Sequence, residues 1–160
     1  TEVGVDARRG LEQDDVISEL ASLSERRTHQ IDQTPTGSDV MGPTGKLRPL
    51  GQVLRMRCLD MWVHEQDVLD ALGRPGTFES PAATITLTSG LALAGRAWQA
   101  QDPSPGHLHI TVDDWDGSPI DLGGEGDELH LACSRSELLE LLSGRTMDVD
   151  PRWRALNIAP

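Results

Sequence analysis

The stretch RCLDMWVHEQDVLDALGRPG, residues 57–76, has the apolar spacing of one long helix followed by a glycine–proline stop signal. An α-helix has about 3.6 residues per turn, so Asp60 and His64, four residues apart, project from the same face. Met61 and Val68 lie beside them on that face. We therefore expect the packing that buries Met61 and Val68 to cover His64 as well, which predicts a histidine and a carboxylate in the protein interior.

The same helix is expected to begin between residues 47 and 50 and to end at Leu72. Gly73 is the residue type that commonly terminates a helix, and Pro75 cannot continue one. An amphipathic helix of this length needs a second apolar surface to cover it. Its predicted apolar stripe consists of Leu50, Val53, Leu54, Met61, Val68 and Leu72.

Two further helices are predicted on either side of this one. Residues 11–27 place apolar side chains on one face and acidic ones on the other, which is typical of an amphipathic helix. Residues 32–46 are rich in Gly, Pro, Ser, Thr and Asp and predict a loop. Ser80 followed by Pro81 has the pattern of a helix start, and a mostly apolar helix is expected to run from there to about residue 100.

Beyond residue 106 the apolar period changes from that of a helix to that of a strand. Residues 107–113 alternate, a second short strand is expected around residues 120–122, and residues 127–133 alternate again. Ser134 and Glu137 then have the spacing of a capping box, which predicts a final helix that Gly144 ends. The sequence therefore predicts a chain with a helical first half and a small α+β second half.

The histidines of these strands require a separate interpretation. His107 and His109 are two residues apart, opposite Leu108 and Ile110, so they share one face of the predicted sheet. We interpret this face as solvated. A metal site there is the less favoured alternative, because the sequence shows no carboxylate at ligand spacing.

Composition and charge exclude several classes of protein. The 160 residues include 26 acidic and 14 basic side chains, a formal charge of −12, which argues against binding to the phosphate backbone of nucleic acid. The sequence contains no run of 18 or more apolar residues, so no membrane span is predicted. Cys58 and Cys133 have no CxxC partner, so both are expected to be core or boundary residues of a cytoplasmic protein.

The stretch LDMWVHEQDVLDALGRPG, residues 59–76, together with SRSELLELLSGR, residues 134–145, resembles the actinobacterial mycothiol-dependent maleylpyruvate isomerase family. The resemblance implies an α+β protein: a partial DinB-like helical bundle over residues 1–100 and a small sterol-carrier-like α/β domain over residues 101–160. Two helices that the family carries before position 11, the second with a metal-binding histidine, have no counterpart in this sequence.

The resemblance also implies a site. In the family a divalent metal is held by a histidine on an early helix and by an acid and a histidine four residues apart on a later one, a pair that matches Asp60 and His64. Asp stands here where the isomerases have Glu. Asp67, on the same ridge, is expected to orient the imidazole. The implied cofactors are zinc and mycothiol or a similar low-molecular-weight thiol, whereas the catalytic and thiol-binding residues stay unidentified.

The implied function is that of a metal- and thiol-dependent isomerase or S-transferase-like protein acting on a small electrophilic molecule, provided that a third metal ligand is supplied. Three alternatives stay open. In the first, the chain is a non-catalytic small-molecule or lipid-binding module. In the second, it is an interaction domain. In the third, Asp60 and His64 are only a structural hydrogen-bonded pair. A homo-oligomer, or a second chain that supplies helices, is the expected partner; neither nucleic acid nor a membrane is expected.

Overall fold

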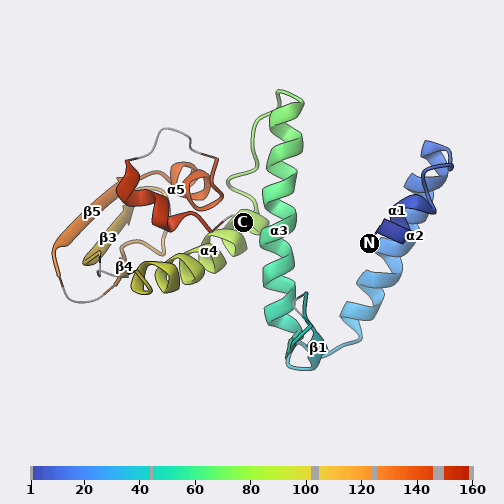
Figure 1. Ribbon diagram of the computed structural model, residues 1–160, viewed down its shortest axis with the longest axis horizontal. Coiled ribbons are helices and arrows are strands. Elements are labelled where there is room, and N and C mark those ends of the chain that lie inside the picture. The colour runs from blue at the N-terminus through green and yellow to red at the C-terminus, as the bar shows by residue number, and fades with distance from the viewer. Residues whose placement is uncertain (1, 44, 102–104, 124–125, 146–149, 159–160) are drawn as a thin grey trace. The chain divides into compact units, whose positions relative to one another are not determined.

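The computed structural model describes residues 2–43, 45–101, 105–123, 126–145 and 150–158. It contains helices and two small sheets, which confirms the α+β fold class (Figure 1). Within the described residues, no helix combines the length and apolar character that a bilayer crossing requires. The elements are α1 (Glu2–Asp6), α2 (Gln13–Asp32), β1 (Asp39–Met41), β2 (Leu47–Pro49), α3 (Leu50–Ala71), α4 (Pro81–Gln99), β3 (His107–Val112), β4 (Ile120–Leu122), β5 (Glu128–Cys133), α5 (Arg135–Leu142) and the 3₁₀ helix η1 (Pro151–Leu156).

The first compact unit is Thr1–Val53. Its main element is α2, which confirms the predicted amphipathic helix and extends it by several residues. Arg8 pairs with Glu19 and ties the segment before α2 to that helix. The predicted loop over residues 32–46 is partly wrong, because β1 lies within it and pairs with β2 as an antiparallel hairpin. Strands of three residues are too short to show an alternating pattern amid glycine and proline.

The start of α3 lies in this unit and confirms part of the predicted stripe. Leu50 and Val53 are buried. Farther along α3 the prediction is wrong, because Met61, Val68 and Leu72 keep between 58% and 70% of their surface exposed. The helix itself and its end are as expected: Gly73, with a φ of 62°, follows the last turn.

The buried face of α3 carries Trp62 and Gln66, which are 1% and 2% exposed. Trp62 packs edge-on against Phe78, with ring centroids 5.9 Å apart. Gln66 is held by Thr77, which receives a hydrogen bond from Nε2 at 2.8 Å and donates its backbone N–H to Oε1 at 3.0 Å. The returning segment after α3 therefore covers this side of the helix, about one residue step around from Met61.

The second compact unit, Leu54–Pro160, holds the larger core. Its sheet has the order β4-β3-β5, with β3 antiparallel to β4 and parallel to β5. Alternation along β3 buries Leu108, Ile110 and Val112 and leaves His107 and His109 on the opposite face. The inward residues of β3 share one core cluster with α4, α5 and η1.

Helix α4 belongs to that core. Ser80 caps it by accepting a hydrogen bond from the N–H of Ala83 at 3.1 Å, and Pro81 occupies the first turn, as predicted. Leu87, Ala94 and Trp98 pack in the same cluster as the sheet, and α4 lies within the second compact unit, which begins at Leu54. The predicted domain boundary near residue 100 instead placed α4 with the preceding helices. At α5, the capping box of Ser134 and Glu137 is present as predicted.

Candidate functional site

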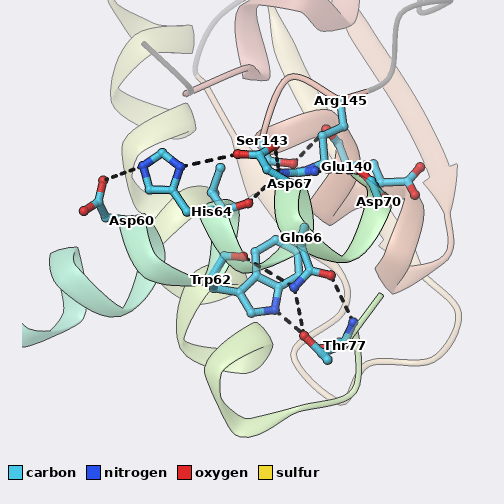
Figure 2. Close-up of polar contacts among 11 residues, drawn as sticks. Asp60, Trp62, His64, Gln66, Asp67, Asp70, Thr77, Glu140, Ser143 and Arg145 are labelled. Carbon is cyan, nitrogen blue, oxygen red and sulfur yellow. Dashed lines mark hydrogen bonds and ion pairs between the residues drawn. The ribbon is translucent and has the colours of Figure 1, made fainter. Parts of the chain in front are cut away.

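His64 lies on the exposed side of α3, contrary to the expectation that it faces the interior. Its side chain is 74% exposed and that of Asp60 is 52% exposed. The reason is the burial of Trp62 and Gln66, which turns the ridge of Asp60 and His64 away from the core that covers α3. Helical spacing nevertheless brings the two side chains together: His64 Nε2 and Asp60 Oδ1 are 3.9 Å apart (Figure 2).

The other ring nitrogen of His64 has a carboxylate neighbour. His64 Nδ1 lies 3.4 Å from Asp67 Oδ2, which matches the expected orienting role of Asp67 (Figure 2). A proton on Nδ1 satisfies this contact and leaves Nε2, the nitrogen directed at Asp60, with a free lone pair. This tautomer is the one that a metal-binding imidazole needs.

Arg145 fixes Asp67 from the far end of α5. It donates to Asp67 Oδ1 at 2.6 Å and pairs with Asp70 Oδ2 at 3.2 Å, and it also donates to the carbonyl of Val63 (Figure 2). Desolvation raises the pKa of the Asp67 carboxyl, but the hydrogen bond and charge of Arg145, with a smaller contribution from His64, outweigh it, and the pKa is lowered overall. Asp67 is therefore anionic at neutral pH.

Sequence reasoning missed Arg145. The residue follows Gly144 directly, and its backbone N–H bonds to the carbonyl of Glu140, so the chain is already leaving the helix. Its side chain is 14% exposed and lies against α3, more than 70 residues away in sequence. A basic residue just after a helix end is common for purely local reasons, so no sequence signal pointed to this contact.

The residues of α3 alone do not make a complete metal site. A zinc site with an open position uses three protein ligands, whereas Asp60 and His64 supply two and Asp67 is engaged by Arg145. In the described part of the chain, no three His, Cys, Asp or Glu side chains are grouped in a way that could hold a metal ion. The pair therefore fits two positions of such a site and leaves the third to another group.

The two cysteines of the chain are poor candidates for a nucleophile. Both are free and partly buried, as expected. Burial raises the pKa of Cys58, and burial together with the nearby acids Glu137, Asp113 and Asp114 raises the pKa of Cys133 to about 11. The thiolate is the reactive form, so neither side chain is activated at neutral pH.

A cavity of about 350 Å³ lies in the second unit, apart from the α3 ridge. The segment of residues 76–80 lines it together with Asp114, Arg135 and Ser136. Arg135 donates to Thr84 Oγ1, and its Nε is buried without a hydrogen-bond partner. The lining combines Phe78 with polar side chains and with the charges of Glu79, Asp114 and Arg135, so the cavity suits a small polar molecule better than a lipid chain.

Comparison with known families matches the first part of the chain. Residues 2–69 match the family model described as the mycothiol maleylpyruvate isomerase N-terminal domain. The matched range includes Asp60 and His64, and it supports the family expected from the sequence for that part of the chain. No curated protein and no solved structure match the chain.

Proposed function

Because residues 2–69 match the family model of the mycothiol maleylpyruvate isomerase N-terminal domain, we propose that this chain acts in thiol-dependent isomerisation or S-transfer on a small electrophilic molecule. The family match over α3 is the observation that carries the proposal. Mycothiol or a similar low-molecular-weight thiol is the proposed cofactor. The raised pKa values of Cys58 and Cys133 support an external thiol over a protein one.

The proposed metal pair is Asp60 and His64. Their separation of 3.9 Å already approaches the distance between two ligands of one ion, about 3.3 Å for tetrahedral zinc. Asp67 holds the imidazole so that Nε2 faces Asp60, and Arg145 holds Asp67. Exposure of the pair leaves room for an approaching ligand from a second chain, which is our proposed source of the third donor.

A divalent cation bound there supplies one kind of chemistry: it lowers the pKa of a thiol and stabilises the thiolate. The residues of this chain do the rest. Asp67 orients the ring of His64 through its Nδ1 proton, and Arg145 keeps Asp67 anionic and in place. Arg145 in turn is anchored by the carbonyl of Val63, within the same turns of α3.

The test is isomerisation of maleylpyruvate by the full chain in the presence of mycothiol and zinc, followed by absorbance. We expect His64→Ala to abolish the activity, because it removes a ligand and leaves Asp60 alone. Arg145→Met is expected to lower kcat without removing metal binding, since Arg145 only positions Asp67 and His64. Circular dichroism reports whether each variant is folded.

His29→Ala is the matched control, because His29 is the exposed histidine near the end of α2 and has no expected role at the site. Its activity should equal that of the parent chain. Equal activity in His64→Ala and the parent chain contradicts the proposal. So does a parent chain without activity when mycothiol and zinc are in excess over a range of protein concentrations.

Association with a second copy belongs to the same proposal. Helix α2 has no buried residue, and its apolar side chains Ile17, Leu20 and Leu23 are exposed. An exposed apolar face of this kind favours self-association. Sedimentation equilibrium distinguishes a monomer from an associated form, and a monomer at all concentrations contradicts this part of the proposal.

A cytoplasmic location stays a prediction.

A second candidate function rests on the cavity between residues 76–80, Asp114 and Arg135. It is the non-catalytic small-molecule-binding module foreseen from the sequence. The charged side chains of Glu79, Asp114 and Arg135 in the lining, together with the buried Nε of Arg135, favour a small polar molecule with a hydrogen-bond acceptor over a lipid. Binding of short-chain carboxylates that is lost in Arg135→Met and retained in His64→Ala separates this function from the thiol-dependent one.

A further inference from the structure

Three charged side chains line the cavity of the second unit. Glu79 lies just before α4, Asp114 follows β3, and Arg135 is the first residue of α5. These segments are far apart in sequence. The core that α4 and α5 share with the sheet brings them to one cavity.

The three charges do not neutralise one another. Among the described residues, no ion pair joins Glu79, Asp114 or Arg135 to an oppositely charged side chain. Asp114 does contact Arg135, but its Oδ1 accepts the backbone N–H of Arg135, at 2.7 Å, and not a guanidinium donor. Charges of both signs therefore remain available to a molecule that enters the cavity.

The guanidinium group of Arg135 keeps a donor for such a molecule. One terminal nitrogen donates to Thr84 Oγ1. The Nε atom is buried and has no hydrogen-bond partner in the described part of the chain. A buried donor without an acceptor lowers stability, and carboxylates are among the strongest acceptors for a guanidinium group. Arg135 is thus suited to the carboxylate of a ligand.

A carboxylate alone matches this cavity poorly, because the two acids Glu79 and Asp114 outnumber the one arginine. Both acids repel a second anion and attract a cation. An ammonium group on the same ligand offsets the repulsion. Phe78 also lines the cavity, and an aromatic ring is a favourable contact for an ammonium group. The volume of about 350 Å³ is in the range of sites for small molecules.

We propose that the cavity binds a small zwitterion, a molecule with both an ammonium group and a carboxylate, such as a free amino acid. Arg135 binds the carboxylate, and Glu79 and Asp114 attract the ammonium group. The inference rests on the small-molecule-binding function proposed above for this cavity and names its ligand class. It does not depend on the thiol chemistry proposed for Asp60 and His64.

The probes are alanine, propionate and ethylamine, which differ in whether they carry both charged groups, only the carboxylate or only the ammonium group. Each is titrated into the full chain, and two-dimensional NMR spectra report the affinity. We expect alanine to bind at least about tenfold more tightly than either of the other two, because only alanine interacts with both signs of charge. Arg135→Met should weaken the binding of alanine by at least about tenfold.

Asp114→Asn separates the two charges of the ligand. Asparagine keeps an oxygen for the backbone N–H of Arg135 but removes the negative charge. The variant should weaken the binding of alanine and leave that of propionate unchanged or stronger. Glu128→Gln is the matched control, because it removes the same charge from a side chain of β5 that is 79% exposed and outside the cavity. It should change neither affinity, and circular dichroism reports whether each variant is folded.

Each outcome decides a different point. Equal affinities for alanine and propionate would overturn the zwitterion as the ligand and leave the cavity a carboxylate site. The same affinity for alanine in Asp114→Asn and Glu79→Gln as in the parent chain would also overturn it. No binding of any probe would contradict the function of the cavity as well. Isomerisation of maleylpyruvate is measured separately, so the thiol-dependent function and this inference fail independently.

Discussion

Helices α2 and α4 are nearly equal in length but differ in what they bury. The 20 residues of α2 include none that is buried, whereas the 19 residues of α4 include seven. Both contain leucine and isoleucine. The apolar residues of α2 alternate with acids and arginines, and its N-cap residue, Glu12, makes no side-chain capping bond.

The difference shows where the free energy of folding comes from. Helix α4 packs against α5, η1 and β4, and its Ser80 cap satisfies a backbone donor at its start. Hydrophobic burial contributes about 25 cal/mol per Å² of apolar surface, so α4 gains much more than α2 from its own side chains. A helix without such burial is held mainly by local interactions and is expected to open more readily.

The largest expected effect comes from removing apolar volume in α4. Leu87 is fully buried in the core cluster, so Leu87→Ala should lower the free energy of unfolding by about 2–5 kcal/mol. Urea denaturation followed by tryptophan fluorescence measures it, because all four tryptophans lie in the second unit. A loss below about 1 kcal/mol would show that α4 is not the centre of that core.

An intermediate effect is expected at the start of α4. Ser80→Ala removes the acceptor for the N–H of Ala83 and should cost about 1 kcal/mol in the free energy of unfolding. Ser80→Thr keeps the hydroxyl and serves as the control, with a smaller loss. The same fluorescence assay applies. A cost for Ser80→Ala no larger than that for Ser80→Thr would indicate that the cap contributes nothing beyond packing.

The smallest effect is expected in α2. Leu20 is 63% exposed, so Leu20→Ala makes the same chemical change as Leu87→Ala but should alter the free energy of unfolding by less than about 0.5 kcal/mol. Circular dichroism at helix wavelengths follows it, since α2 contains no tryptophan. A loss of 2 kcal/mol or more that grows with protein concentration would mean that an associated copy covers Leu20, which removes the contrast with α4.

Local signals in the sequence identified most of the elements. Ser80 before Pro81, and Ser134 three residues before Glu137, each combine a capping side chain with a helix start, and both caps are present. The alternation of Leu108, Ile110 and Val112 identified the central strand. These signals succeed because capping and pleating depend on neighbours within a few residues. The short hairpin β1–β2 carried no such pattern and was missed.

The candidate sites divide in the same way. Helical spacing alone determined that Asp60 and His64 lie side by side, because i and i+4 positions adjoin in any α-helix. Which face of α3 is buried was decided by Thr77 and Phe78, which cover Trp62 and Gln66 and leave the Asp60–His64 ridge exposed. The contact of Arg145 with Asp67 likewise joins residues far apart in sequence.

The histidine cluster on the outer face of the β4-β3-β5 sheet gives the sharpest case. The sequence determined that His107 and His109 share one face of a strand, because side chains alternate along it. It did not provide their carboxylate, since Asp121 lies on another strand and reaches them only through the antiparallel register of β3 and β4. The parallel pairing of β3 and β5 places His130 opposite His109. Register depends on how the whole sheet packs on its helices, so only the tertiary structure could bring these side chains together.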